Sequence, residues 1–319
     1  MGINNPISWN NFLLNSRSIS VLIKLIKILD GGIFNVWGKK MILIISSKLD
    51  KAGENIRESL LQNYPFEKLE GDTFYNKNKD ALLVRIENET IFTDFPENII
   101  LEKIRDYNLG KFDSIIFATR HKSVAKIPTL TCHTPGNFGN ADYGGKDGQV
   151  CISNPIFQKL ALQEIMNLSK ELEIKFQVSL EATHHGPLTG MPTTFIEIGS
   201  DENYWSIKEA GDLIASAIYK SLSYKDNLKS FRVASGIGGG HYCPKFTEIM
   251  LNTDIAIGHV IAKYNTPVTD SMLSELVLKS NPFDIILLDW KGIKERSDLK
   301  DKLTNTNISF ARTSDIVKE

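Results

Sequence analysis

Short, nearly continuous apolar runs along the chain alternate with longer segments whose apolar residues recur with helical spacing. Met41–Ser46 and Asp113–Arg120 are such runs, as expected of strands that are covered on both faces. Asp50 can cap a helix after the first run, and Asn154-Pro155 is a typical start for a longer one. This alternation predicts a single three-layer α/β domain over residues 41–319, built around a mixed, mostly parallel sheet.

Further strands are predicted where apolar and polar residues alternate or form short apolar blocks. We expect Lys175–Glu181 and Thr193–Gly199 to be neighbours in the sheet. A long helix, capped by Ser200 or Asp201, should follow the second of them, and another helix is expected near Thr269–Lys279. The remaining strands are expected at Ala81–Ile86, Thr90–Phe92, Thr129–His133, Arg232–Ser235, Ile255–Ile261 and Asp284–Leu288.

The charge composition excludes nucleic-acid binding through a global positive field. The 319 residues include 37 lysines and arginines against 38 aspartates and glutamates, so stable DNA binding is not expected and any RNA contact must come from a local patch. Three scattered cysteines are too few for a disulfide framework or a zinc knuckle, which favours a cytoplasmic location. The oligomeric state stays open between a monomer and a small homo-oligomer.

Residues 1–40 differ from the rest of the chain, because five of them are basic and only Asp30 is acidic. The apolar stretch Ile19–Leu29 is interrupted by two lysines, so it is too short and too charged to span a bilayer, and no membrane association is expected. A targeting helix is one interpretation. Because Met41 begins the first buried strand, we favour another, in which residues 1–40 are an N-terminal extension that folding and activity do not need.

All six histidines lie at or just after predicted strands, and none lies in a predicted helix. They are His121, His133, His184, His185, His241 and His259. Four of them border loops rich in glycine or proline, where the backbone can approach a ligand closely, and histidine offers a metal ligand or a group that titrates near neutral pH. We therefore expect a shared polar site. It needs a bend at Gly186-Pro187, because adjacent residues of a strand point to opposite faces.

Two glutamates and a glycine run are further candidates. Glu181 ends an alternating strand and Glu197 lies between isoleucines, so either could be a metal ligand or a general base, although Glu181 could also face solvent. Gly236–Gly240 has neither the dinucleotide fingerprint nor the lysine of a P-loop; its amides could face a phosphate or an oxyanion, unless it is only a tight turn. Arg120 and its basic neighbours could bind phosphate or form a solvated loop.

Several long strings resemble the archaeal-and-plant type of D-aminoacyl-tRNA deacylase. They are Ser179-Leu-Glu-Ala-Thr-His-His-Gly-Pro, Phe195-Ile-Glu-Ile-Gly-Ser followed by Trp205, and Gly236-Ile-Gly-Gly-Gly-His-Tyr-Cys-Pro-Lys-Phe-Thr. The opening Ile42-Leu-Ile-Ile-Ser-Ser-Lys-Leu-Asp, Arg120-His-Lys-Ser, His133-Thr-Pro-Gly-Asn-Phe and Gly258-His259 match in the same order. The resemblance covers residues from about 41 to 311 and leaves residues 1–40 without a counterpart.

The resemblance implies a hydrolase that cleaves the ester joining a D-amino acid to the 3′ end of tRNA, with the aminoacylated tRNA end as partner and translation quality control as role. It also implies a fold like those of nucleoside phosphorylases and peptidyl-tRNA hydrolases, and zinc, two ions per subunit. On these motifs we place the metal ligands at His184, His241 and Glu181, and the catalytic residues at His184, His185, His241 and Glu197. Substrate binding is placed at Arg120, His121, His133, Asn137, Gly238, Gly239 and Gly240.

Three alternatives share parts of this pattern. A peptidyl-tRNA hydrolase-like enzyme would act on the same tRNA end without a metal, and a nucleoside phosphorylase-like enzyme would need a phosphate site near Arg120. A non-catalytic protein that binds the tRNA end would leave charged tRNA intact. Assays on D- and L-aminoacyl-tRNA and on N-blocked peptidyl-tRNA, with and without chelator, separate these alternatives.

Overall fold

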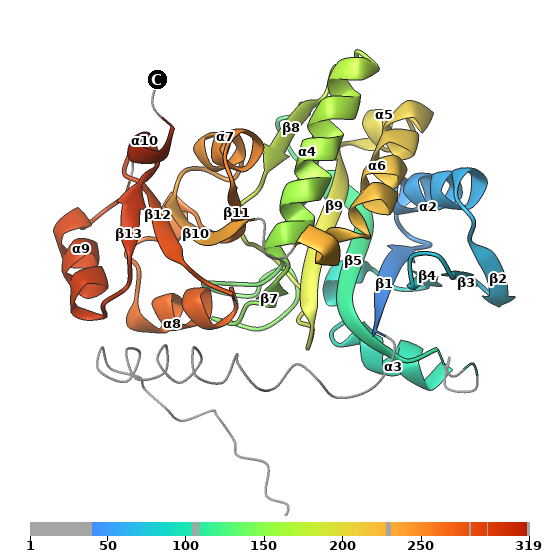
Figure 1. Cartoon of the computed structure of the whole chain (residues 1–319), viewed down its shortest axis with the longest axis horizontal. Coiled ribbons are helices and arrows are strands. Elements are labelled where there is room, and N and C mark those ends of the chain that lie inside the picture. Colours follow the sequence, from blue (N-terminus) through green and yellow to red (C-terminus); the bar gives the residue numbers. More distant parts are fainter. Residues whose placement is uncertain are drawn as a thin grey trace, which may run out of the picture.

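The computed structural model describes residues 40–317, apart from 104–106, 108, 228–230, 281 and 292. The predicted N-terminal extension therefore lies outside the described residues, except for Lys40. Strands and helices alternate along the chain, and the strands form two sheets with helices packed on them (Figure 1). The predicted α/β domain with mixed, mostly parallel strands is confirmed, but the sequence pattern does not predict the division into two sheets.

The larger sheet has the strand order β2-β3-β4-β1-β5-β9-β6-β8, with β7 paired to β9. The strands β4, β1, β5 and β9 run parallel to one another, whereas β6 is antiparallel to β9 and parallel to β8. The members are β1 (Lys40–Ser47), β2 (Glu67–Glu70), β3 (Thr73–Asn76), β4 (Ala81–Ile86), β5 (Lys111–Lys122), β6 (Thr129–His133), β7 (Ile152–Ser153), β8 (Gln177–Leu180) and β9 (Pro192–Ser200).

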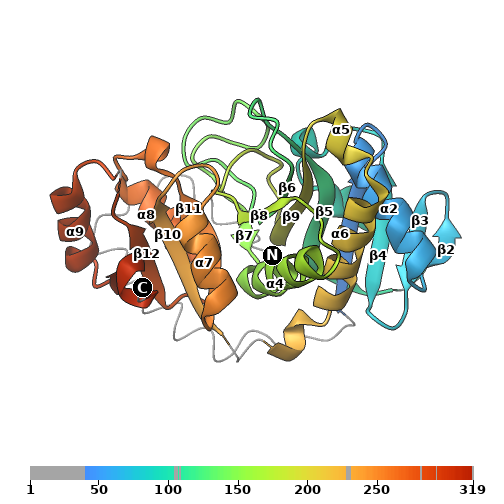
Figure 2. The same cartoon turned by 90° about the horizontal axis from the view of Figure 1, so that it is seen from above.

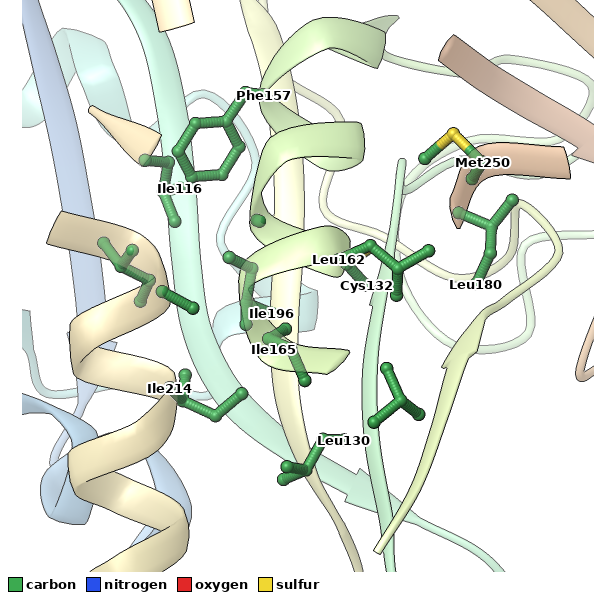
Figure 3. Close-up of a cluster of buried hydrophobic side chains, with 14 of the residues drawn as sticks. Ile116, Leu130, Cys132, Phe157, Leu162, Ile165, Leu180, Ile196, Ile214 and Met250 are labelled. Atoms are coloured by element: carbon green, nitrogen blue, oxygen red, sulfur yellow. The ribbon is translucent and has the colours of Figure 1, made fainter. Parts of the chain in front are cut away.

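The smaller sheet has the order β11-β10-β12-β13 and its strands are parallel. They are β10 (Arg232–Gly238), β11 (Ile255–Ile261), β12 (Ile285–Asp289) and β13 (Phe310–Arg312). Helix α4 contacts both β6 of the larger sheet and β11 of the smaller one, so a single apolar core continues between the two sheets. Figure 3 shows this core, in which Ile116 lies beside Phe157 of α4 and Ile196 lies beside Ile165 of the same helix.

Helices cover the sheets on defined faces. Helices α2, α4 and α6 lie on one face of the larger sheet (Figure 2), while α3 packs against its other face. Helix α7 packs on one face of the smaller sheet, and α8 and α9 pack on the other. No helix in the described part of the chain is long and apolar enough to cross a membrane. The bounds are α2 (Lys51–Asn63), α3 (Pro96–Lys103), α4 (Pro155–Glu171), α5 (Glu202–Trp205), α6 (Lys208–Ser221), α7 (Pro244–Asn252), α8 (Asp270–Leu278), α9 (Arg296–Asn305) and α10 (Thr313–Ile316).

The predicted helix starts are confirmed by their caps. The side chains of Asp50, Asn154 and Thr269 each accept a hydrogen bond from a backbone amide of the first turn of α2, α4 and α8. Such a bond satisfies one of the four amides that a helix leaves unpaired at its start. Local polar chemistry therefore fixes where these helices begin.

Three predictions about the elements are wrong. Thr90–Phe92 is a 3-10 turn, because local amides bond to the carbonyl three residues earlier, such as Thr93 N to the Thr90 carbonyl at 3.1 Å. β8 pairs with β6 and not with β9, because β6 lies between them. The long helix is divided into α5 and α6, since the Asn55 side chain donates to the carbonyls of Trp205 and Ile207 at 3.0 and 2.8 Å.

The face of the larger sheet away from α2, α4 and α6 carries the polar residues of interest. In the register of β5, β9 and β6, His133 pairs with Phe195, and His121 pairs with Gly199. Glu197 lies between these two levels on β9. Because alternate residues of a strand point to the same face, Phe195, Glu197 and the neighbouring His133 and His121 share one side of the sheet.

Candidate active site

Five of the six histidines form one cluster with Glu181 and Glu197. They come from the ends of β5 and β6, from the loop after β8 and from the loop after β10. The ring centroids of His133 and His184 are 4.3 Å apart, and those of His184 and His241 are 4.6 Å apart. The members are His121, His133, His184, His185 and His241.

A sharp turn brings His184 and His185 to the same site. The backbone φ of His185 is 45°, in the left-handed region. The amide of Gly136 donates to the His185 carbonyl at 2.7 Å, and Pro135 pairs with His184, so the loop after β6 holds this turn. The two ring centroids are 4.3 Å apart, which means that both rings face the cluster. The bend expected next to Gly186-Pro187 is thus present.

Backbone carbonyls fix the tautomers of these two histidines. Nδ1 of His184 lies 2.8 Å from the carbonyl oxygen of Ala182, and Nδ1 of His185 contacts the carbonyl oxygen of Gly186. Because a carbonyl oxygen only accepts, both Nδ1 atoms donate and both Nε2 atoms keep a lone pair when the rings are neutral. Burial lowers the pKa of His184 well below its usual range and that of His185 to about 4. Both rings are therefore neutral ligands or bases near pH 7.

Backbone pairing between the two sheets positions His241. The amide of Ala182 donates to the His241 carbonyl at 2.9 Å, and the amide of Cys243 donates to the Leu180 carbonyl at 3.0 Å. Between these bonds Glu181 and Tyr242 form an antiparallel bridge. The segment after the glycine turn of β10 is thereby attached to the end of β8, which places the His241 ring next to the Glu181 carboxylate.

Glu181 is the central carboxylate of the cluster. Its oxygens lie 3.3 Å from His121 Nδ1 and His241 Nε2, 3.7 Å from His184 Nε2 and 3.8 Å from His133 Nδ1. The side chain is 0% exposed. The alternative that Glu181 faces solvent is therefore wrong.

Glu197 lies on the sheet side of the cluster. Its Oε1 accepts a hydrogen bond from Thr119 Oγ1 at 3.0 Å. Its Oε2 lies 3.5 Å from His121 Nδ1 and 3.8 Å from His133 Nδ1. Oε2 also accepts a hydrogen bond from Thr131 Oγ1 at 3.5 Å. Both oxygens are thus held by the sheet, and Oε2 also faces the histidines.

Burial and mutual contacts drive the pKa values of the cluster apart. Burial would raise the pKa of Glu181, but the side chains of His241, His121 and His184 lower it to about 2. Burial raises the pKa of Glu197, and the nearby charge of Glu181 adds to this effect. Burial would lower the pKa of His121, but Glu197 and Glu181 raise it to about 9. Glu181 is therefore the carboxylate that holds the negative charge, and Glu197 is the one that binds a proton more readily.

The ring of His133 is buried without a hydrogen bond to any residue that the structure describes. Its side chain is completely buried, and neither ring nitrogen has a hydrogen-bond partner in the described part of the chain. Burial and the neighbouring histidines lower its pKa well below the usual range, so the ring is neutral. An unpaired buried polar group costs about 1–3 kcal/mol. A ligand that accepts the lone pair of one ring nitrogen would remove the cost at that nitrogen.

The donor atoms fall into groups of the size that a metal ion needs. In each group the donor atoms lie within 4.8 Å of one another. Nitrogen and carboxylate oxygen are donors that zinc prefers, so the residues fit a zinc site. Of the predicted ligands, Glu181 and His241 share a group, whereas His184 belongs to another. The groups are His133, His184 and His185; His121, Glu181 and His241; and His133, Glu181 and Glu197.

Aromatic rings form the apolar edge of the cluster. Phe195 of β9 stacks on Phe117 of β5 with ring centroids 4.6 Å apart. The rings of His133 and His185 lie 5.4 and 5.0 Å from that of Phe195. The ring of His133 has no hydrogen bond in the described part of the chain, and that of His185 has one to the neighbouring residue. Packing against Phe195 therefore helps to orient both rings.

The structure does not bring Arg120 to the cluster. Arg120 follows Thr119 on β5 and points to the face covered by helices. Its guanidinium pairs with Glu89 at 2.9 Å, donates to the Leu49 carbonyl at 2.6 Å and lies over the Trp205 ring. Arg120 thus connects the loops after β1 and β4 to α5, and its charge is already compensated.

Asn137 and the glycine turn border the cluster through neighbouring residues. The Asn137 side chain donates to the Gly144 carbonyl at 2.9 Å and so shapes the loop after β6. Gly238 has φ of 105°, and a Cβ there would lie 2.2 Å from the Asp289 carbonyl oxygen, so only glycine fits. The turn delivers His241 to the site, and the carbonyl of Gly239 accepts from the Lys263 amide at 2.9 Å.

His259 is the histidine that stays outside the cluster. It is completely buried in β11, Nε2 donates to the Cys151 carbonyl at 3.0 Å, and Nδ1 accepts from Thr183 Oγ1 at 3.0 Å. Both ring nitrogens are thus satisfied in the neutral ring. Burial lowers the pKa of His259 to about 3. Its role is structural.

Replacing His259 by asparagine should destabilise the fold by about 1–3 kcal/mol at pH 8, because two buried hydrogen bonds are disturbed. The folded pKa lies below the unfolded value, so wild-type His259 loses stability as pH falls through about 6.5. The variant lacks this loss, and the difference between the two proteins should shrink by about 1.4 kcal/mol at pH 5.5. Urea unfolding at pH 8 and pH 5.5 measures the free energy of unfolding of both proteins. If the difference between them did not change with pH, His259 would not be a neutral buried histidine.

Tyr242 belongs to the site although the sequence reasoning did not single it out. Its Oη lies 2.9 Å from His121 Nε2, so the two nitrogens of His121 contact Tyr242 on one side and the carboxylates on the other. The only signal in the sequence is its place directly after His241. Phe195 was likewise missed, because an aromatic residue in a strand normally indicates core packing.

The family model and the curated relatives that match this chain carry the same name. Residues 109–311 match the family model described as D-aminoacyl-tRNA deacylase. A curated protein of that name from Pyrococcus furiosus is 38% identical over 272 residues, which cover 83% of this chain and 97% of the relative. Its counterpart from Pyrococcus abyssi is 41% identical and covers 80% and 92%, and that from Methanococcus vannielii is 33% identical and covers 79% and 90%.

A solved structure also shares the fold. The crystal structure of a conserved protein of unknown function has a TM-score of 0.78 and 29% identity to this chain. The match covers 89% of this chain and 99% of that protein. The arrangement of two sheets is therefore shared along nearly the whole of a solved relative.

Proposed function

The chain belongs to the D-aminoacyl-tRNA deacylase family, and we propose that it hydrolyses the ester between a D-amino acid and the 3′ end of tRNA at the histidine–glutamate cluster. The observation that carries the location is the convergence of four histidines on one buried carboxylate, Glu181: they are His121, His133, His184 and His241. A role in translation quality control in the cytoplasm follows from this activity, and D-Tyr-tRNA is our representative substrate.

Zinc is the cofactor that we assign to this cluster, with two ions per subunit. One would be held by His133, His184 and His185, of which His133 has no hydrogen bond at either ring nitrogen in the described part of the chain, and the other by His121, Glu181 and His241. When bound, zinc supplies Lewis-acid polarisation of the ester carbonyl and a water of lowered pKa. An aminoacyl ester is already reactive, so this chemistry is sufficient.

The chain's own residues position the ester and move the proton. Glu181 holds His241 and His121 in place through its charge. Glu197 Oε2 faces the histidines and binds a proton readily, so we assign proton transfer to this atom. The amides of the Gly238–Gly240 turn, next to His241, are assigned to the oxyanion. Arg120 is left out of the substrate contacts, because Glu89 already compensates its charge.

The stereochemical test uses D-Tyr-tRNA and L-Tyr-tRNA with equal concentrations of protein. We expect the D form to be cleaved at least about 10²-fold faster, because the two esters have the same intrinsic reactivity and only the fit of the transition state differs. Chelator should abolish the activity and zinc should restore it. Cleavage of both forms at equal rates would indicate a general esterase, and cleavage of N-blocked peptidyl-tRNA without metal would favour the peptidyl-tRNA hydrolase-like alternative.

Tyr242→Phe should lower kcat about tenfold with little change in KM. The Tyr242 hydroxyl holds His121 Nε2, so its loss frees the ring whose Nδ1 faces Glu181 and Glu197. Loss of such a supporting partner typically weakens metal binding about 10- to 100-fold, which a competition titration of zinc measures independently of activity. Tyr219→Phe, in a ring stacked on Tyr64, is the matched control. Unchanged zinc affinity in Tyr242→Phe would show that His121 needs no such support.

A further inference from the structure

Three aromatic side chains around the cluster are largely exposed to solvent. Phe92 is 62% exposed, Tyr143 is 68% exposed and Tyr264 is 57% exposed. Single exposed apolar residues are common, but these three come from different segments that each contact a loop of the cluster. We call Phe92, Tyr143 and Tyr264 the aromatic rim.

Tyr143 and Phe92 are attached to the His185 side of the cluster. The carbonyl of Tyr143 accepts a hydrogen bond at 2.9 Å from the amide of Gly186, the residue after His185. The loop around Tyr143 is packed closely on Ile91 and Phe92, because a Cβ on Gly144 would lie 1.9 Å from the Ile91 carbonyl oxygen and 3.3 Å from the Phe92 ring. This loop, drawn in green in Figure 2, lies on the side of the molecule away from α4 and α7.

Tyr264 is attached to the His241 side. Its neighbour Lys263 donates its amide to the Gly239 carbonyl, two residues before His241. The next residue, Asn265, approaches the loop after β6, because a Cβ on Gly139 would lie 3.5 Å from the Asn265 side chain. The aromatic rim therefore spans the loops that carry His185 and His241, which are also the loops of the more exposed part of the cluster: His184 is 25% exposed and His241 is 34% exposed.

Uncompensated lysines accompany the aromatic rim. Lys146 lies three residues after Tyr143, and Lys263 precedes Tyr264. Both are exposed, and within the part of the chain that the structure describes neither of them forms an ion pair. Asp142 and Asp147 lie in the same loop, so the local field is only weakly positive. This combination suits a ligand with flat apolar surfaces and few phosphates.

We propose that the aromatic rim binds the unpaired nucleotides that precede the terminal adenosine of the tRNA 3′ end, with bases stacked on Phe92, Tyr143 and Tyr264. This inference rests on the proposed function, which places the terminal ribose at the cluster. Unpaired bases offer free π faces, and aromatic side chains bind them without sequence preference. Lys146 and Lys263 then meet the phosphates between these bases.

The test compares D-Tyr-tRNA with D-tyrosyl adenosine, which has the same ester but no preceding nucleotides. Phe92→Ala, Tyr143→Ala and Tyr264→Ala should each lower kcat/KM for D-Tyr-tRNA about 5- to 100-fold, mainly through KM, and leave D-tyrosyl adenosine unchanged. Tyr143→Phe should keep full activity, since stacking needs the ring and not the hydroxyl. Leu172→Ala, at the exposed end of α4, is the control.

Each other outcome overturns the proposal in a recognisable way. Equal losses on both substrates would mean that the rings contact the amino acid or the adenosine, and no loss on either would mean that the rim binds no nucleotide. Both outcomes leave the proposed function standing, because the wild-type protein remains active. A wild-type protein that cleaves neither substrate would instead refute the proposed function itself.

Discussion

His241→Ala and His184→Ala should each lower kcat on D-Tyr-tRNA by at least about 10²-fold. Removing a residue that transfers a proton or stabilises charge in the transition state typically lowers kcat by this factor. The two residues belong to different donor groups, one with Glu181 and His121 and the other with His133 and His185. Each substitution removes one of three donors from its group. We therefore expect zinc to be lost together with activity, one ion for each variant.

Metal content and single-turnover rates of the same preparations provide the measurement. Far-ultraviolet circular dichroism and urea unfolding show whether each variant is folded. His259→Asn is the matched control, because it replaces a buried histidine outside the cluster and should keep activity within about tenfold while losing stability. Full activity of rigorously metal-free wild-type protein would refute the zinc assignment and leave the histidines as general base and hydrogen-bond donors.

Strands and caps are the features that could be predicted from the sequence, because they depend on local pattern. Thr129–His133 and Ala81–Ile86 are strands with the predicted bounds, and Asp50 caps α2 as expected. Which strands become neighbours depends on contacts between distant residues. The pairing of β8 with β6, and the separation of β10 to β13 into a second sheet, could not be read from hydrophobic periodicity.

The candidate site shows the same division between local and distant information. Histidines at strand ends are visible in the sequence, and five of the six come together. Strand alternation could have separated Arg120 from His121, since adjacent residues of β5 face opposite sides. The central place of Glu181, by contrast, depends on the bridge to Tyr242, which joins segments about 60 residues apart. No pattern within β8 indicates that bridge.

Glu181→Gln should have the larger effect of the two carboxylate substitutions, with kcat lowered by about 10²- to 10³-fold, as for loss of a preorganised charge. Glu181 contacts four histidines at 3.3–3.8 Å and carries the negative charge of the cluster, as its lowered pKa indicates. Glutamine has the same shape but is neutral, and its N–H₂ group can neither accept a hydrogen bond nor bind a metal ion as a carboxylate oxygen does. Zinc at the group of His121 and His241 should weaken with it.

Glu197→Gln is the internal comparison, because Glu197 binds a proton more readily and a neutral amide resembles its protonated form. Its Oε1 would still accept from Thr119, so the fold and the zinc content should be kept. We expect kcat to fall only about tenfold to 10²-fold, with the loss confined to proton transfer and visible as a changed pH profile. The reverse order, with Glu197→Gln losing zinc and Glu181→Gln retaining it, would show that the sheet-side carboxylate and not the central one holds the charge on which the site is built.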